Sequence, residues 1–120
     1  MGEYRGPAGL GVADRGPHYK GVDVAPVKKT LSAAGQSGGE FSPILGRPFN
    51  ATHKPTGSFS GSYQLERKFG DDATWYVVLG YSDLASLPET FAMTETEEAV
   101  VYRWTLISVS AGSVATRLSA

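Results

Sequence analysis

Two histidines and a group of carboxylates are the residues whose types allow acid–base or metal chemistry. His18 and His53 stand far apart in the sequence, which is a poor pattern for a metal site. Glu66 with Asp71 or Asp72 offers the pair of carboxylates that glycoside hydrolysis requires. Strand alternation around Glu66 places this residue on a polar face, however, and the two aspartates are typical of a hairpin turn. Structural roles are therefore favoured for all five residues.

Other catalytic groups are also poorly represented. The chain has no cysteine, which excludes thiol catalysis, disulfides and cysteine-based zinc sites. Residues 6–11 are rich in glycine but lack the Lys-Ser/Thr pair of a phosphate-binding loop. The sequence therefore predicts no catalytic, metal-binding or cofactor-binding residue, and we expect a protein that is not an enzyme.

Charge and hydropathy argue against two further classes of partner. The 120 residues carry 11 Lys and Arg against 12 Asp and Glu, which gives a net charge of −1. This balance shows no sign of the basic surface that nucleic-acid binding requires. No apolar run approaches the roughly 18 residues of a membrane span, and the first residues lack the basic and apolar parts of a signal peptide. We therefore expect a protein made inside a cell, with neither nucleic acid nor membrane as a partner.

Glycine and proline are concentrated in the first part of the chain. Residues 1–46 hold ten of the 15 Gly and four of the seven Pro, whereas residues 47–120 hold most of the aromatic residues. The first part cannot bury enough apolar surface to offset the entropy of ordering it. We predict an extended N-terminal arm over 1–46, with one short strand around 22–27, that orders against a partner; a disordered tail is the alternative. The predicted partner-binding residues of the arm are Tyr4, Tyr19, Val22, Val24 and Phe41.

Residues 47–120 have the alternation and the turn chemistry of β-strands. Expected strands cover 48–53, 58–69, 74–79, 89–94, 100–109 and 114–119, with turns at 70–73, 94–98 and 110–113. Short strands at this spacing predict an all-β fold, namely a small antiparallel β-sandwich or barrel of about six to seven strands. One helical turn is expected at 84–87, where Pro88 ends it.

Aromatic residues in this second part raise a choice between core and ligand contact. A Trp in a small sandwich usually fills the core, which is the first interpretation for Trp75 and Trp104. If Tyr76, Tyr102 and Trp104 instead share an outer face, they form a platform for a sugar ring or for a subunit interface. Of these two we favour the interface, so Tyr76 and Trp104 join the predicted partner-binding residues.

Four short motifs lie along residues 57–119. They are Gly57-x-Phe59-x-Gly61-Ser62-x-x-Leu65-Glu66-Arg67-x-Phe69, Ala73-Thr74-Trp75, Val101-Tyr102-Arg103 and Gly112-Ser113-Val114-x-x-Arg117-Leu118-Ser119. Together they resemble small β-sandwich modules in virion proteins of tailed bacteriophages. The resemblance covers most of 47–120 and none of the arm. It implies a structural component of a phage particle, and an arm followed by a sandwich resembles capsid decoration (cement) proteins.

The small size of the sandwich favours assembly with other chains. A domain of this length buries only roughly 60–65% of its unfolded surface, and no disulfide supports it. We therefore expect a homo-oligomer, such as a trimer, that binds the major capsid protein or other virion proteins in particles assembled in the bacterial cytoplasm. The alternatives are a tail, collar or fibre adaptor and, from a different class, a carbohydrate-binding module that holds a glycan with Tyr76 and Trp104.

Overall fold

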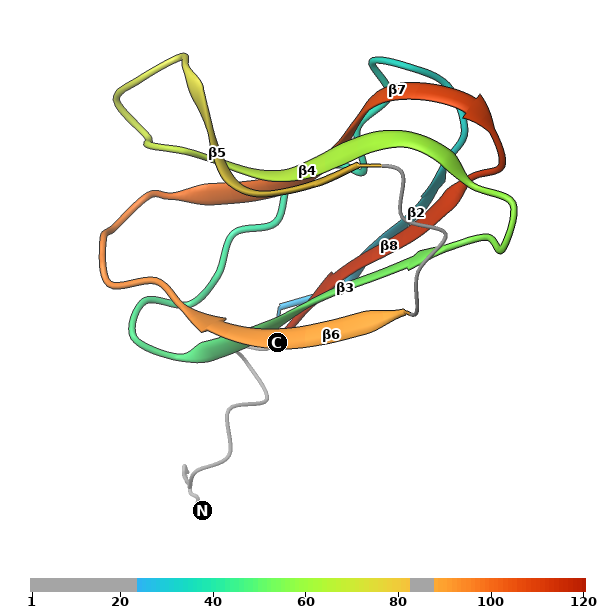
Figure 1. Ribbon diagram of the computed structural model, residues 1–120. Coiled ribbons are helices and arrows are strands. Elements are labelled where there is room, and N and C mark those ends of the chain that lie inside the picture. The colour runs from blue at the N-terminus through green and yellow to red at the C-terminus, as the bar shows by residue number, and fades with distance from the viewer. Residues whose placement is uncertain (1–23, 83–87) are drawn as a thin grey trace.

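Seven strands make up the computed structural model, which describes residues 24–82 and 88–120. In chain order they are β2 (Val27–Leu31), β3 (Pro48–Pro55), β4 (Ser60–Lys68), β5 (Trp75–Ser82), β6 (Glu89–Thr94), β7 (Val101–Ala111) and β8 (Val114–Ser119). They form two antiparallel sheets that lie over each other as two layers (Figure 1). The described ranges contain no helix that could cross a membrane. The predicted all-β sandwich is confirmed.

The four-stranded sheet has the strand order β2-β8-β3-β6. On β3, Phe49, Ala51 and His53 are buried against the other sheet, while the residues between them face outward. Strand β8 continues this alternation, since Ala51 pairs with Leu118, which is also buried. Period-two alternation is the pattern of a sheet with one face in the core and one in water.

The three-stranded sheet has the order β5-β4-β7. Tyr63 and Leu65 of β4 point into the core and are almost completely buried. Near the start of β4 the register with β7 shifts, and Gly61 adopts a φ of 154° there. A Cβ atom at this position would lie 2.1 Å from the carbonyl oxygen of Ser108. Only glycine therefore allows the two backbones to approach each other at this bulge.

Residues 24–46 belong to the sandwich, which corrects the arm boundary predicted at residue 46. Strand β2 pairs with β8 over its whole length. The segment 35–41 runs beside β7, and its backbone N–H groups donate to carbonyls of that strand: Gly35 to Leu106 at 2.7 Å, Gly38 to Trp104 at 2.8 Å and Phe41 to Tyr102 at 2.8 Å. Paired backbone therefore orders a stretch whose composition predicts little side-chain burial. Residues 1–23 of the predicted arm lie outside the described residues.

Aromatic side chains fill the space between the sheets. The largest fully buried side chain is that of Trp104, and its ring centroid lies 5.9 Å from that of Tyr63. Phe41 and Phe49 pack on each other at the far side of the core, 5.5 Å apart. Trp75 is only partly buried on β5. The core interpretation is thus correct for Trp104 and wrong for Trp75.

The predicted strand boundaries can be compared directly with the structure. The strands expected at 89–94 and 114–119 coincide with β6 and β8, and the other four differ by a few residues at their ends. The short strand expected around 22–27 is instead β2, which begins at Val27. The helical turn expected at 84–87 lies in the gap between the two described ranges.

Candidate functional site

Three of the four sheet edges carry a feature that prevents another strand from pairing there. The outer edge of β7 is occupied by segment 35–41. Strand β2 presents Lys28 and Lys29, and β6 is short and begins with Glu89 directly after Pro88. Covering segments, charges, prolines and short strands are the usual protection of sheet edges.

Strand β5 is the edge without charge or proline. Its outer N–H and C=O groups pair with no strand in the described part of the chain, because β5 ends the order β5-β4-β7. Its exposed side chains are large and apolar: Tyr76 is 44% exposed, Val77 58% and Leu79 40%. A sheet edge of this kind is a template for an added strand. We therefore take the β5 edge, defined as Trp75–Ser82, as the candidate docking site.

A bulge shapes this edge. Glu66 of β4 pairs with Val77, but the adjacent Leu65 pairs with Leu79, so Val78 is an extra residue on β5. Bulges bend a strand and redirect its side chains. The bulge accounts for large side chains that are exposed on both sides of β5, and it divides the outer edge into two short runs that an added strand can pair with.

A charged and aromatic cluster lies beside the edge, on the outer face of the same sheet. The Arg103 guanidinium lies 4.0 Å from the centroid of Trp75, and its Nε donates to Glu66 at 2.7 Å. The hydroxyl of Thr105, at 2.8 Å, and the amide of Gln64 also donate to this carboxylate. Burial favours a raised pKa for Glu66, but the bonds from Arg103, Gln64 and Thr105 outweigh it and hold the pKa below the ordinary value. The carboxylate therefore accepts three hydrogen bonds from side chains of its own sheet.

The turn before β5 holds the first exposed side chain of the edge. The Asp72 carboxylate accepts the backbone N–H of Thr74 at 2.9 Å and the hydroxyl of Tyr76 at 2.8 Å. The bond from Thr74, followed by that from Tyr76, lowers the pKa of Asp72, and the bond to Asp72 raises the pKa of Tyr76. The Tyr76 ring also packs on Phe69, with centroids 5.6 Å apart. The aspartate thus acts as a turn residue that orients Tyr76 along the edge.

A buried histidine joins the two sheets. His53 is 1% exposed, with Nδ1 2.5 Å from the Tyr63 hydroxyl and Nε2 2.9 Å from the Glu89 carboxylate. Because a carboxylate only accepts, Nε2 donates to Glu89, and the Tyr63 hydroxyl donates to Nδ1. Burial lowers the pKa of His53 despite the opposing effect of Glu89, and burial raises the pKa of Tyr63. His53 and Tyr63 are shielded from solvent, whereas the Glu89 side chain is 56% exposed, so this network connects the sheets and reaches solvent only through that carboxylate.

The sequence also contains a serine motif that is absent from the predicted site residues. Residues 35–39 read Gly-Gln-Ser-Gly-Gly, which fits the G-x-S-x-G pattern of hydrolases. In those enzymes the serine sits on a sharp turn between a strand and a helix. Here Ser37 instead forms a β-bridge with Thr105 along the edge of β7, and an extended segment follows it. Within 24–82 and 88–120, no group of three or more His, Asp or Glu residues is placed to hold a metal ion.

The predicted partner-binding residues fall into three groups. Tyr4, Tyr19 and Val22 lie outside the described residues. Val24 is partly buried and packs against the core, whereas Tyr76 lies exposed on β5.

The prediction of a partner contact is wrong for Phe41 and Trp104, because each side chain is 1% exposed and fills the core of its own chain. Tyr102 is equally buried, so the outer platform of Tyr76, Tyr102 and Trp104 does not exist. Strand alternation places Tyr102 and Trp104 on the inner face of β7. Val77 and Leu79, which the prediction did not include, share the exposed edge with Tyr76; the apolar run 75–79 predicts a strand there but not its place at the end of a sheet.

Comparison with known proteins adds no relative to this description. No protein-family model matches the chain, and no curated protein matches it. The candidate docking site is therefore defined by the chain's own residues, above all by those of the exposed β5 edge.

Proposed function

We propose that this protein is a non-enzymatic structural protein of a phage virion, most simply a capsid decoration (cement) protein that binds the major capsid protein through the β5 edge. The virion assignment is based on the resemblance of the four sequence motifs. The observation that carries the mode of binding is the exposed apolar row of Tyr76, Val77 and Leu79 on an edge without charge. Assembly takes place in the bacterial cytoplasm.

Strand addition explains how such an edge binds. An extended segment of the shell protein pairs with the free N–H and C=O groups of β5, and apolar side chains on both sides of the strand contact the shell. One short strand gives a weak contact, but many copies on a continuous shell multiply weak contacts through effective concentration. A trimer of this chain adds to that effect, and Tyr4 and Tyr19 in residues 1–23 remain predicted contacts.

The carbohydrate-binding alternative has less support. A sugar-binding aromatic residue needs a free ring face, but the Arg103 guanidinium lies 4.0 Å from the Trp75 centroid, and the Lys68 ammonium lies 5.2 Å from it. Trp104 is buried. A tail, collar or fibre adaptor uses the same edge and differs from a decoration protein in its copy number.

The test compares two substitutions on exposed apolar residues of the same sheet. Val77→Lys places a charge on the β5 edge, whereas Ile107→Lys places one on β7, where Ile107 is 46% exposed. Both purified variants are mixed with capsids that lack this protein and are then co-sedimented. We expect Val77→Lys to lose binding and Ile107→Lys to keep it, because an edge lysine prevents strand pairing.

Two measurements can contradict this proposal. If both variants co-sediment like the unmodified protein, the β5 edge is not the attachment site. Quantitative mass spectrometry of purified particles then tests the virion assignment itself. Copies in proportion to the shell protein support decoration, a few copies per particle support the adaptor, and absence from the particle refutes virion membership.

A further inference from the structure

The outer face of the four-stranded sheet contains a hollow with an alanine as its floor. Strands β2, β8 and β3 run side by side, and their register places Lys28 opposite Arg117 and Arg117 opposite Thr52. The next row, two residues along, consists of Thr30, Ala115 and Lys54. The side chains of the other five residues in these two rows thus surround Ala115, which is the one small residue among the six. The hollow above it has a volume of about 440 Å³.

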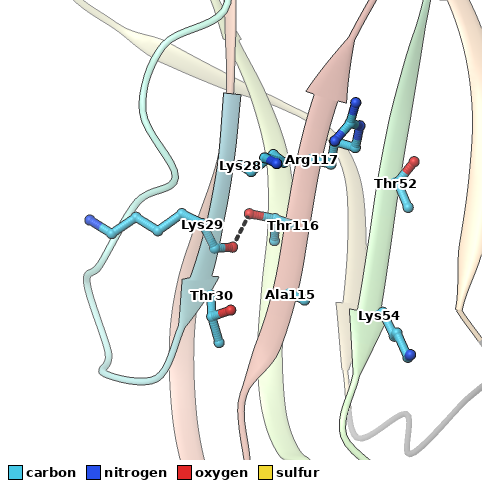
Figure 2. A pocket seen from close by; sticks show the side chains of 8 residues that line it. All are labelled: Lys28, Lys29, Thr30, Thr52, Lys54, Ala115, Thr116 and Arg117. Carbon is cyan, nitrogen blue, oxygen red and sulfur yellow. Dashed lines mark hydrogen bonds between the residues drawn. The ribbon is translucent and has the colours of Figure 1, made fainter. Parts of the chain in front are cut away.

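All five side chains around the floor are hydrogen-bond donors, and three are cations. Figure 2 shows Lys28, Arg117 and Lys54 on the strands around Ala115, with the side chains of Arg117 and Lys54 pointing in opposite directions along the sheet, whereas the side chain of Lys29 extends away from the hollow. Within the described ranges, no carboxylate forms an ion pair with any of the three cations. The outward-facing residues of β2, β8 and β3 include no Asp or Glu: Lys28, Thr30, Pro48, Asn50, Thr52, Lys54, Ala115, Arg117 and Ser119.

Within 24–82 and 88–120, no carboxylate offsets the repulsion between these like charges. Lys28 and Arg117 are direct cross-strand partners, with side chains about 5 Å apart at Cβ, and Lys54 is the diagonal neighbour of Arg117 at about 7–8 Å. Like charges at such positions destabilise a sheet. An anion bound among these cations lowers their repulsion, and charged donors form strong hydrogen bonds to oxyanions.

We propose that this hollow is a binding site for a compact, multiply charged oxyanion, namely the phosphate group of a small phosphate or pyrophosphate ester. The three cations border one hollow of about 440 Å³, a volume that suits a compact anion. In the unbound protein the Nε of Arg117 donates to Ser119 Oγ at 3.3 Å, so the guanidinium has to turn from Ser119 to contact an anion above Ala115. The face carries no aromatic side chain on which the bases of a nucleic acid could stack. The proposal is independent of the virion assignment, since it concerns the sheet opposite the one that contains β5.

The test is a titration of the protein with pyrophosphate at constant ionic strength, in which binding is measured from the NMR chemical shifts of the backbone amides. We expect saturable shifts centred on Ala115, Lys28 and Lys54. Lys28→Gln should raise the dissociation constant about tenfold, as expected for the loss of one charge-assisted hydrogen bond. The matched control, Lys29→Gln, removes the same charge from the next residue of β2 and should change the constant less than twofold.

A second pair of variants tests the hollow itself without a change of charge. Ala115→Leu fills the floor and should abolish binding, whereas Ala92→Leu adds the same side chain to the exposed face of β6 and should leave binding intact. The amide spectrum of each variant shows directly whether it is folded. The proposal is overturned if pyrophosphate causes no saturable shift, or if Lys29→Gln weakens binding as much as Lys28→Gln. It is also overturned if only duplex DNA or heparin binds, because the face is then a surface for an extended polyanion.

Discussion

Phe41→Ala tests whether segment 35–41 is part of the sandwich or an arm that waits for a partner. The Phe41 side chain is 1% exposed, and its ring lies 5.5 Å from that of Phe49. Its backbone exchanges two hydrogen bonds with Tyr102, at 2.8 and 2.9 Å. Truncation of a buried Phe to Ala costs about 3–5 kcal/mol. For a domain of this size, that loss lowers the melting temperature by roughly 15–25 °C.

The assay is urea unfolding of the purified protein, measured by tryptophan fluorescence, to which the buried Trp104 contributes. Leu45→Ala is the matched control, because Leu45 lies in the same part of the chain but is 47% exposed, and we expect a change within about 0.5 kcal/mol. Phe41→Leu, a smaller change, keeps the measurement possible if Phe41→Ala does not fold. The reasoning is refuted if both Phe41 variants are as stable as Leu45→Ala, since segment 35–41 would then contribute nothing to the core.

Two further predictions concern the pH dependence of stability and a backbone contact. Burial holds the pKa of His53 below 6.5, so its contribution to stability is complete above pH 6.5 and is lost as the pH falls through the lowered pKa. The free energy of unfolding should therefore decrease from about pH 7 to pH 5, and His53→Gln should flatten this decrease; an unchanged slope would contradict the assignment. Gly61→Ala should prevent folding, because its Cβ meets the carbonyl of Ser108 at 2.1 Å. Gly80→Ala, with open space around it, should give a soluble protein with a normal circular dichroism spectrum.

Local pattern explains which strands were predictable. Strands β4 and β8 alternate apolar and polar residues, and turn residues lie next to them, namely Gly70 after β4 and Gly112 before β8. These signals depend only on neighbours in the sequence. Strand β2 has no such pattern, because it is ordered by pairing with β8 at the other end of the chain. Composition cannot reveal that β8 is the partner of β2, and residues 27–41 were therefore predicted to belong to the arm.

The candidate sites depended on register in the same way. A net charge of −1 gave no sign of a basic face, because Lys28, Lys54 and Arg117 become neighbours only when three strands pair in one register. The exposure of Val77 and Leu79 required the position of β5 at the end of its sheet, which strand propensity does not contain. The sequence singled out Tyr76, which is exposed on β5, but it did not indicate the burial of Phe41.

The position of β8 has a consequence for how the protein is made. This strand is the last in the sequence, yet it lies between β2 and β3 and hydrogen-bonds to both. While the chain grows on the ribosome, β2 and β3 have no shared neighbour, and Leu31 and Ala51 lack their buried cross-strand partners Val114 and Leu118. Closure of the sandwich therefore waits until residues 114–119 have left the exit tunnel.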